Sequence, residues 1–587
     1  MQEQGTTTTL LPALPDDAAV SRALGWASAT HLRAAVILVL VALACFLPGL
    51  SGIAPVDRDE ARFAQATRQM METGDFVDIR FQDEPRYKKP VGIYWLQAAT
   101  IAATGHGADA PIWAYRLASV LGARAAVLLT YWAALPLFGR KAGLIAGLAM
   151  ATAPILVAEA HLAKTDAVLL ATVVLVQGVL ARAYVADIGF RTALLFWVGL
   201  GLGVLVKGPI VLMVAGLTAL ALVAVDRRAA WLGRLRPAIG VPAALLIILP
   251  WFVAILSVAG TGFFSASVGD DLLGKVATGQ ESHGAPPGYH LVLFFVLLLP
   301  ATALLPAAIR PIWTVRGQAA MRFCLAWLLP SWLVFELVAT KLPHYTLPLY
   351  PAAAILIGAV AADGRLVTGR WWTRGAALIP AFLVAGIAIG GLVLLARLEG
   401  IVSPAAPLLA IAVVILAMAA ARATWTDRPL AGAGLLAAAA IAAYAALLGF
   451  VLPEAQTFRL SPRLAAEVAS RAHCAEPRLV ATGYGEPSIV FLTETGIRFA
   501  DPRSAADFLG GSGCRLALVE ARREDAFLAR AARRGLALER LGTVEGMNLG
   551  RLQPLAIGIY RAAPRDGQGG PTESPASRLL RPGIEPI

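Results

Sequence analysis

Repeated apolar runs of 17 residues or more constrain the fold of this chain more than any other feature. A run of that length is about what a helix needs to cross the hydrocarbon core of a bilayer. Only 15% of the 587 residues are charged, against about a quarter in soluble domains. The mean hydropathy is +0.68. We therefore expect a polytopic membrane protein whose membrane domain is all-α, rather than a large soluble protein.

These apolar runs predict thirteen membrane-spanning helices. The expected spans are 34–53, 116–138, 141–158, 166–185, 193–206, 209–225, 238–256, 289–309, 321–339, 344–362, 376–396, 405–421 and 430–452. A further run at 91–105 is short for a span, so we expect it to lie at the membrane surface or to re-enter the membrane.

The distribution of arginine and lysine predicts which side of the membrane each loop faces. With the N-terminus in the cytoplasm, five basic loops fall on the cytoplasmic side, as the positive-inside rule requires. These loops are 139–141, 226–237, 310–322, 363–374 and 421–429. If 91–105 crossed the membrane, all five would lie outside. The net charge of +12 therefore reflects topology rather than nucleic-acid binding, and the C-terminus is expected outside.

The chain divides into four expected parts. They are a cytoplasmic tail at 1–30, disordered or lying on the membrane surface, a membrane domain at 31–452, a small α/β domain at 453–563 and a disordered tail at 564–587. The membrane domain contains a first external loop at 54–115, with juxtamembrane helices, and a second external loop at 257–288.

Four cysteines are present. Cys45 and Cys324 lie in apolar spans and are expected to pack as small hydrophobic residues. Cys474 and Cys514 lie in the α/β domain and would be able to pair if that domain is extracytoplasmic, which the sequence alone leaves open.

The polar stretch 56–94 follows the first expected span directly. It carries Asp57, Asp59, Glu60, Arg62, Arg86, Lys88 and Lys89. A basic external loop opposes the positive-inside rule, which suggests that its charges serve a function. Asp59 and Glu60 open an amphipathic helix, where they either favour the helix dipole or provide a general base. Lys88 and Lys89 either anchor the loop to headgroups or bind a lipid phosphate.

Two further residues at span ends fall on the same expected side. Asp166 either caps a helix or works with Asp59 to orient an acceptor or hold a divalent cation. Lys207 either marks the turn between two short spans or points into the same polar cavity.

Later external segments add a possible phosphate site. Lys341 would complete such a site together with Lys89 and Lys275, because fixed positive charge stabilises a phosphate leaving group. His344 would carry a proton or make a hydrogen bond. His283 lies in the Gly- and Pro-containing loop 257–288, which is either a mobile substrate loop or a flexible spacer.

Seven short motifs, taken together and in order, resemble those of the GT-C class of integral-membrane glycosyltransferases, in the superfamily of protein mannosyltransferases and lipid A aminoarabinose transferases. The motifs are D-E-A-R-F-A at 59–64, K-K-P at 88–90 with Y-W at 94–95, L-A-K-T-D at 162–166, K-G-P at 207–209, P-W-F at 250–252, G-A-P-P-G-Y at 284–289 and K-L-P-H-Y at 341–345. The resemblance covers about 34–350 well and the remainder more loosely.

The resemblance implies a GT-C membrane fold and an enzyme that takes a sugar from a polyprenyl-phosphate donor. It implies that Asp59 acts on the acceptor as the acid/base residue and that Lys89, Lys275 and Tyr345 hold the donor phosphate. The sequence departs from the family at Lys88, where Glu is usual, and at Lys275, where close aminoarabinose transferases have Arg. These departures bear on the sugar rather than on the reaction class. At position 275, lysine keeps the positive charge of arginine but not its bidentate geometry.

The candidate site combines both lines of reasoning. The catalytic candidates are Asp59, Glu60 and Asp166, the donor-phosphate candidates are Lys88, Lys89, Lys275, Lys341 and Tyr345, and the other substrate-binding candidates are Arg62, Tyr94, Lys207, His283 and His344. No definite cofactor is predicted, and a divalent metal at Asp59 and Asp166 is an open alternative.

These observations predict a hexosyl- or pentosyltransferase of the bacterial inner membrane that inverts the anomeric carbon. The expected donor is an undecaprenyl-phosphate type of sugar, and the expected acceptor is lipid A or another envelope glycolipid or glycan. We expect a monomer that contacts membrane lipids and no nucleic acid. The alternatives are a protein O-mannosyltransferase-like enzyme, a transporter or flippase of lipid-linked sugars, and a non-catalytic scaffold. Charges crowded at one interface, without a visible repeat, favour the enzyme over the transporter.

Overall fold

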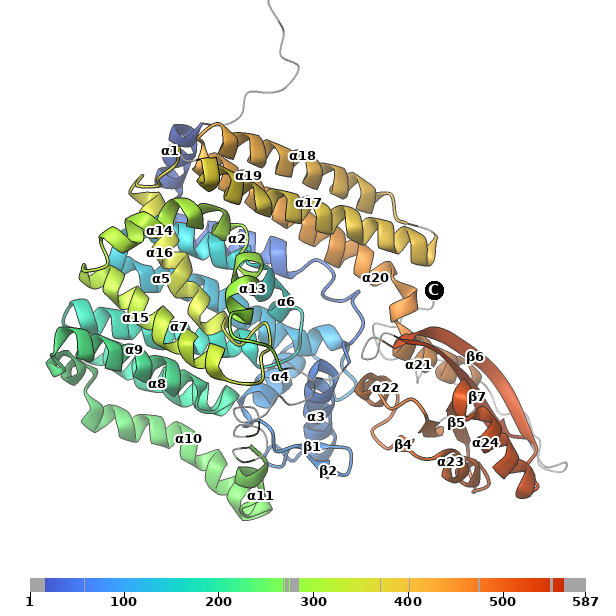
Figure 1. Cartoon of the computed structure of the whole chain (residues 1–587). Coiled ribbons are helices and arrows are strands. Elements are labelled where there is room, and N and C mark those ends of the chain that lie inside the picture. The colour runs from blue at the N-terminus through green and yellow to red at the C-terminus, as the bar shows by residue number, and fades with distance from the viewer. Residues whose placement is uncertain are drawn as a thin grey trace, which may run out of the picture.

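A computed structural model describes residues 16–563, except for 58, 268, 270–273, 275–283, 370, 401, 473, 475 and 549–552. The chain forms a bundle of apolar helices and, after it, a smaller domain built on a β-sheet (Figure 1). The short helix α20, Leu452–Glu454, leads from the bundle to this domain. The expected tail at 564–587 lies outside the described residues.

The bundle contains the helices expected from the apolar runs. They are α2 His31–Phe46, α5 Ile112–Ala151, α6 Pro154–Ala160, α7 Asp166–Val185, α8 Phe190–Lys207, α9 Ile210–Asp226, α10 Pro237–Ala259, α13 Tyr289–Leu297, α14 Leu305–Thr314, α15 Ala319–Leu337, α16 Tyr350–Ala362, α17 Trp371–Glu399, α18 Ala405–Trp425 and α19 Pro429–Ala446. The chain is therefore a multi-pass membrane protein with an all-α membrane domain.

Within the described residues, eight helices are long and apolar enough to cross a membrane, or up to ten if each of two bent pairs is one span. Each of the thirteen expected spans coincides with one of the helices or bent pairs. The counts differ because α5 is a single 40-residue helix that is non-helical at Gly139, where two spans were expected. In addition, α9 and α16 are short for a span. The number thirteen stays a prediction.

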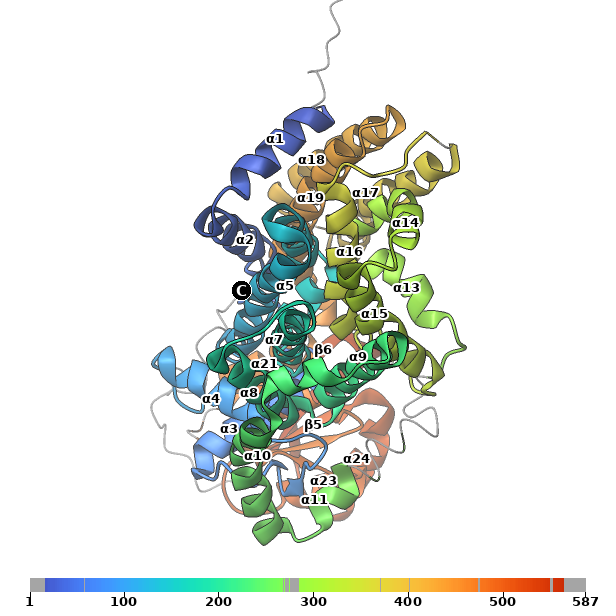
Figure 2. The ribbon, with the colours of Figure 1, turned by 90° about the vertical axis from the view of Figure 1, so that its left-hand side faces the viewer.

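Helix α7 lies in the middle of the bundle, with α5, α8 and α9 packed against it (Figure 2). Close approach to α5 depends on Gly122, since a Cβ there would lie 2.9 Å from the Cα of Val168. Small residues at such crossings let helix backbones approach in a membrane. By contrast, Leu246 and Val253 of α10 and Phe382 of α17 are largely exposed, as lipid-facing side chains are. The polar start of α7 is thus fixed by packing on several sides.

The N-terminal region contains a helix, which contradicts the disordered alternative for the tail, whereas the surface-lying alternative stays a prediction. Residues Asp17–Ala27 form helix α1, which packs beside α19 at the end of the bundle away from the sheet domain (Figure 1). The Asp16 side chain caps it by accepting from the Ala19 N–H, and Asp17 accepts from the Ala431 N–H at 2.9 Å. These contacts tie the segment to the bundle, so the prediction of disorder is wrong for α1. Residues 1–15 lie outside the described residues.

The C-terminal domain is a small α/β domain, as expected. Its elements are α21 Leu460–Arg471, β3 Arg478–Thr482, α22 Pro487–Leu492, β4 Arg498–Phe499, α23 Pro502–Leu509, β5 Arg515–Glu520, α24 Ala521–Arg533, β6 Leu538–Asn548 and β7 Gln553–Ala562. The strand order is β4-β3-β5-β7-β6, with β3 parallel to β4 and β5, and β7 antiparallel to β5 and β6. A disulfide joins Cys474 to Cys514.

Two helices after α2 carry the polar stretch between bundle and sheet domain (Figure 1). They are α3 Asp59–Thr73 and α4 Gly92–Ala103, with the small hairpin β1 Arg80–Phe81 and β2 Glu84–Pro85 between them. The polar face of α3 is buried against the C-terminal domain, where Gln65 donates to Thr495 Oγ1 at 2.7 Å and Arg68 donates to the Phe491 carbonyl at 3.3 Å. The domain thereby holds the helix that begins at Asp59.

Candidate functional site

A cavity of about 250 Å³ opens beside the start of α3 and the start of α7. Among the described residues, its charged and titratable lining consists of Asp59, Arg86, Lys88, Lys89, Lys164, Asp166, Lys207 and His344. Its apolar lining includes Phe63, Leu169, Ile210, Met213, Val334, Phe335, Val338 and Leu347. Five cationic side chains thus face two carboxylates at one end, and the other end continues between α9 and α15, whose outer faces are apolar. This arrangement suits an anionic group attached to a hydrocarbon chain.

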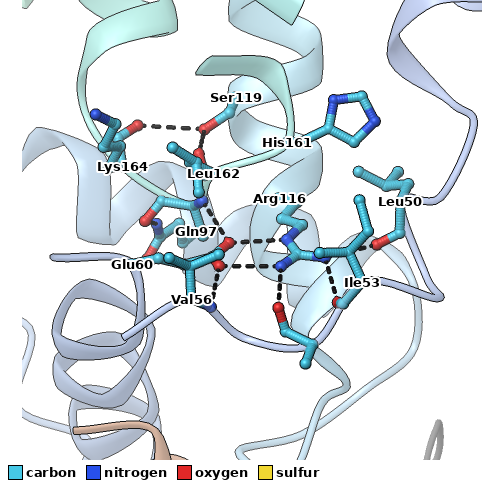
Figure 3. Close-up of polar contacts among 12 residues, drawn as sticks. Leu50, Ile53, Val56, Glu60, Gln97, Arg116, Ser119, His161, Leu162 and Lys164 are labelled. Atoms are coloured by element: carbon cyan, nitrogen blue, oxygen red, sulfur yellow. Dashed lines mark hydrogen bonds and ion pairs between the residues drawn. The ribbon is translucent and has the colours of Figure 1, made fainter. Parts of the chain in front are cut away.

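Glu60 does not line this cavity but anchors the segments around it (Figure 3). Its carboxylate accepts from Arg116 Nε at 2.8 Å and Arg116 Nη2 at 2.9 Å, and both side chains are fully buried. It also accepts the N–H groups of Val56 at 2.7 Å and Ala163 at 2.9 Å. Four donors satisfy this carboxylate, so its charge is compensated where it is buried.

Arg116 extends the same anchor to the end of the first membrane helix (Figure 3). Its Nη1 donates to the carbonyls of Leu50 at 2.9 Å and Ile53 at 2.8 Å, and its Nη2 donates to the Ala54 carbonyl at 3.0 Å. One turn further along α5, Ser119 Oγ donates to the Leu162 carbonyl at 2.6 Å. The loop before Asp59 and the loop before Asp166 are therefore fixed to the same helix.

Inside the cavity, Asp166 lies among positive charges. Its Oδ1 is 2.5 Å from Lys207 Nζ, and its Oδ2 is 3.6 Å from Lys164 Nζ. Lys164 also pairs with Glu159 at 2.9 Å. His344 joins both carboxylates, with Nε2 3.7 Å from Asp166 and Nδ1 3.7 Å from Glu159. The network holds two ammonium groups and an imidazole in fixed positions at the cavity wall.

The opposite wall presents Asp59 and a second set of cations. Asp59 is the first residue of α3 and is exposed to the cavity. Arg86 is buried, with its guanidinium carbon 4.5 Å from the centre of the Phe63 ring. Its Nε is buried and has no hydrogen-bond partner among the described residues. A buried, unpaired charged donor is costly unless a ligand satisfies it. Lys88 and Lys89 line the same side.

Asp57, two residues before Asp59, contacts the C-terminal domain instead of the cavity. Its Oδ1 accepts from the Ser488 N–H at 3.1 Å. Burial raises the pKa of Asp57 to about 6, an effect that the hydrogen bond from Ser488 opposes. The carboxyl group is thus partly desolvated at the junction between α3 and the sheet domain. This hydrogen bond ties the segment just before Asp59 to the C-terminal domain.

Comparison with known proteins identifies related sequences. The family model described as dolichyl-phosphate-mannose-protein mannosyltransferase matches residues 88–253. An undecaprenyl phosphate-alpha-4-amino-4-deoxy-L-arabinose arabinosyl transferase of Pseudomonas aeruginosa is 32% identical over 307 residues, 51% of this chain and 54% of that protein. The protein of the same description from Pectobacterium carotovorum is 28% identical over 374 residues, 61% of this chain and 66% of that protein. The chain spans about half to two thirds of the length of these curated relatives.

Solved structures give the fold. The crystal structure of ArnT from Cupriavidus metallidurans bound to undecaprenyl phosphate aligns with a TM-score of 0.69, at 21% identity, over 89% of this chain and 97% of that chain. Its apo structure aligns with a TM-score of 0.67. The chain has the GT-C fold. The resemblance found in the seven motifs is therefore confirmed.

Most of the expected residues meet in one cavity of the GT-C bundle. Those that line it are Asp59, Lys88, Lys89, Asp166, Lys207, His344 and Tyr345. The ring of Tyr345 lies beneath the Lys207 ammonium at 5.9 Å, a cation–π contact. Lys275 and His283 lie outside the described residues. Residues that are 286 positions apart in sequence thus share one site.

Four expected residues are not part of the cavity lining. Glu60 holds Arg116, and Lys341 is buried with its ammonium donating to the Val338 carbonyl at 2.8 Å. Tyr94 is buried behind Phe63, with the two ring centres 5.5 Å apart. Arg62 is half-buried on α3. Glu60, Lys341 and Tyr94 are therefore engaged by contacts within the protein.

Three residues of the GT-C site were not assigned from sequence. Glu159 ends an apolar run and reads as the edge of a span. Lys164 belongs to the L-A-K-T-D motif, in which only Asp166 was singled out. Arg86 was noted as one charge of the polar stretch without a role. The signal for Arg86 was available, since it stands two residues before Lys88 in the same basic segment.

The structure also bears on the alternative of a divalent cation. Within the described part of the chain, no group of three or more His, Cys, Asp or Glu side chains is placed to hold a metal ion. Both oxygens of Asp166 face lysine ammonium groups, which compete with a cation for the same lone pairs. The donor set around Asp166 does not fit a metal site while Lys207 is in place, so no step is derived through a metal.

Lys207→Ala is expected to weaken binding of a polyprenyl phosphate, the kind of ligand that the resemblance of the motifs implies, by about tenfold or more, equivalent to about 1.4 kcal/mol. The change removes one cation from the cavity and leaves Asp166 with Lys164 at 3.6 Å, so repulsion of the donor phosphate grows. The measurement is the donor KM or a direct binding titration in detergent. Lys141→Ala is the matched control, since Lys141 contacts Ser21 on α1. Equal donor affinity in both variants would remove Lys207 from the phosphate site.

Proposed function

We propose that this protein transfers a sugar from a polyprenyl-phosphate donor of the undecaprenyl type to lipid A or another envelope glycolipid or glycan. The observation that carries the proposal is the cavity, in which cations cluster around Asp59 and Asp166 at one end and apolar side chains of α9 and α15 line the other. A phosphate attached to a polyprenyl chain needs both environments. The undecaprenyl phosphate named for the similar ArnT structure has this chemistry.

The proposed reaction is a single displacement at the anomeric carbon. The acceptor hydroxyl oxygen attacks that carbon, the bond from the carbon to the phosphate oxygen breaks, and the configuration inverts. Asp59 takes the hydroxyl proton as general base. Arg86, Lys89 and Lys207 stabilise the negative charge that develops on the leaving phosphate. The products are the glycosylated acceptor and polyprenyl phosphate.

In this mechanism Asp166 and its partners organise charge rather than transfer a proton. Asp166 lies 2.5 Å from Lys207, so its carboxylate fixes the ammonium group that faces the phosphate. Glu159 and His344 complete the set around Lys164. Charges that are already in position need not rearrange when the transition state forms. A fixed arrangement therefore stabilises the transition state more effectively than a mobile one.

We further propose that the cavity and the C-terminal domain face the periplasm and that the N-terminus is cytoplasmic. The disulfide between Cys474 and Cys514 supports this side, because disulfides persist in oxidising compartments. The five basic loops support it as well, since this orientation puts all of them on the cytoplasmic side, as the positive-inside rule requires. The domain boundaries proposed are 31–452 for the catalytic domain and 453–563 for the periplasmic domain.

Mass spectrometry of envelope lipids and glycans, from cells with and without the gene, tests the proposed function. The expected result is a glycolipid or glycan that carries one additional hexose or pentose only when the gene is present. Complementation with Asp59→Asn should fail to restore it. An unchanged set of envelope lipids and glycans would contradict the proposal. Accumulation of the polyprenyl-linked sugar on one leaflet, without a new product, would favour a flippase.

Cysteine accessibility tests the proposed topology. A single cysteine at Asp83, in a background without other reactive thiols, should react with a membrane-impermeant maleimide added to intact spheroplasts, and a cysteine at Arg228 should react only after lysis. Asp83 is exposed in the polar stretch that carries Asp59, and Arg228 is exposed in a basic loop. Labelling of residue 228 in intact spheroplasts would reverse the topology.

A protein O-mannosyltransferase-like activity is the second candidate. The match of residues 88–253 to the dolichyl-phosphate-mannose-protein mannosyltransferase family favours it. The two candidates share the donor phosphate site and differ in the acceptor. Comparison of glycosylated envelope proteins with glycosylated envelope lipids in the same pair of strains separates them.

A further inference from the structure

The C-terminal sheet has a crevice of the kind that binds ligands in open α/β domains. Strands β3 and β5 are parallel neighbours and end at the same edge of the sheet. The chain leaves β3 toward β4 on one side and leaves β5 toward β7 and β6 on the other. Connections that diverge in this way open a crevice at the carboxyl ends of the strands.

A polar cavity of about 300 Å³ lies at this edge. None of its lining residues also lines the catalytic cavity. Its polar lining comprises Glu486, Glu520, Arg522, Arg523, Asn548 and Gln553. Carboxylate, amide and guanidinium groups are planar and make paired hydrogen bonds, as recognition of sugar hydroxyls and of phosphate requires. The volume is near the lower end of the range for small-molecule sites, about 300–1,000 Å³.

Glu520 is the strongest sign that the cavity is built for a ligand. It is the last residue of β5 and only 8% exposed, yet the ion-pair contact of its carboxylate is with Arg522 at 3.7 Å. Gly483, directly after β3, leaves room for the Glu520 carboxylate. Its φ is +81°, and a Cβ there would lie 2.4 Å from Glu520 Oε2. With its ion-pair contact at 3.7 Å, this carboxylate keeps acceptor capacity that hydroxyl donors of a ligand would use.

The start of α24, directly after Glu520, favours an anion. Arg522 and Arg523 are exposed and stand in the first turn of α24, whose N-cap, Glu520, makes no side-chain capping bond. Positive side chains are unfavourable at a helix N-terminus, where the dipole attracts anions. A phosphate bound there would pair with both guanidinium groups and with the uncapped N–H groups.

The crevice is connected to the catalytic loop through a short segment. Asn548 donates to Glu486 Oε1 at 2.7 Å at the cavity wall. Ser488 stands two residues after Glu486, and its N–H donates to Asp57. Asp57 in turn precedes Asp59 by two positions. Two hydrogen bonds and two short segments thus link the cavity wall to the loop that carries Asp59.

We propose that this cavity binds a phosphorylated sugar unit, the head group of the glycolipid acceptor. The sugar hydroxyls contact Glu520, Glu486 and Asn548, and the phosphate contacts Arg522 and Arg523. The identity of the ligand as acceptor rests on the proposed function, whereas binding of a sugar phosphate does not.

Binding of glucose 1-phosphate to the full-length protein in detergent, followed by saturation-transfer NMR and competition, tests the cavity directly. Arg523→Ala and Glu520→Gln should each weaken binding at least fivefold. Arg533→Ala, the same charge change at the other end of α24, should leave it unchanged. Glucose should compete weakly and inorganic phosphate partially. Wild-type affinity in both cavity variants, or an equal loss in Arg533→Ala, would overturn the proposal.

Two comparisons separate this site from the catalytic cavity and from the proposed reaction. Lys207→Ala should retain the glucose 1-phosphate signal that Arg523→Ala loses, and the reverse pattern would assign the ligand to the catalytic cavity. In transfer assays, Arg523→Ala should raise the acceptor KM at least fivefold with kcat nearly unchanged and with an unaltered donor KM. An unchanged acceptor KM would overturn the acceptor role. If the wild type transfers no sugar, the proposed function fails while the binding result still decides the site.

Discussion

Asp59→Asn should reduce sugar transfer by about 100- to 10,000-fold, the range that general-base catalysis contributes. Asparagine has nearly the shape of aspartate but cannot accept the proton of the acceptor hydroxyl. Asp59 is exposed to the cavity at the first position of α3, so the change leaves no buried charge or void. The measurement is initial rate with purified protein, polyprenyl-phosphate-linked sugar and glycolipid acceptor, at saturating concentrations of both.

Two controls make the result specific to the base. Asp83→Asn makes the same substitution at an exposed position of the β1–β2 turn in the same polar stretch and should keep full activity. The midpoint of thermal unfolding should be the same in Asp59→Asn, Asp83→Asn and the wild type. Full activity of Asp59→Asn would remove Asp59 from catalysis. Loss of activity together with a lower midpoint would mean that Asp59 acts on folding.

The membrane helices were predictable because a helix that crosses a bilayer needs a long run of apolar residues. A helix in hydrocarbon must be mostly apolar along its length, and every expected span falls on a helix or bent pair, two of them on α5. The C-terminal strands β3, β5 and β7 were predictable for a similar reason, since they are short apolar runs buried on both faces. Strand β6 was missed because it lies at the sheet edge, is mostly exposed or half-buried, and carries charged residues such as Glu539 and Arg540 instead of an apolar run.

The side of the cavity was predictable, but its pairings were not. Parity of the spans placed Asp59, Asp166 and Lys207 on one side. Sequence cannot show that Lys207 lies 2.5 Å from Asp166, because that distance is set by how α7 and α8 pack. The same holds for Arg116, which reads as one residue of an apolar helix and proves to be the fully buried partner of Glu60. Adjacent carboxylates, Asp59 and Glu60, looked equivalent until their partners were known.

Arg116→Leu should destabilise the protein by about 3–5 kcal/mol, the cost of breaking a buried ion pair on one side. The change leaves the Glu60 carboxylate buried with only the N–H groups of Val56 and Ala163. It also removes the donors to the Leu50 and Ile53 carbonyls. Thermal unfolding of purified protein in detergent measures the effect. Activity should fall as well, because both loops of the cavity lose their common anchor.

A double-mutant cycle separates the ion pair from the loss of packing. Glu60→Leu alone should be as damaging as Arg116→Leu, because it leaves the guanidinium buried without its counter-ion. The double variant should be more stable than the sum of the two single losses predicts, by at least 1 kcal/mol, since it buries no unpaired charge. Additive losses would show that the pair is not coupled. Comparison with Asp59→Asn should then divide the D-E motif by role. We expect Asp59→Asn to remove activity and leave the unfolding midpoint unchanged, and Glu60→Leu to lower the midpoint because Glu60 holds Arg116.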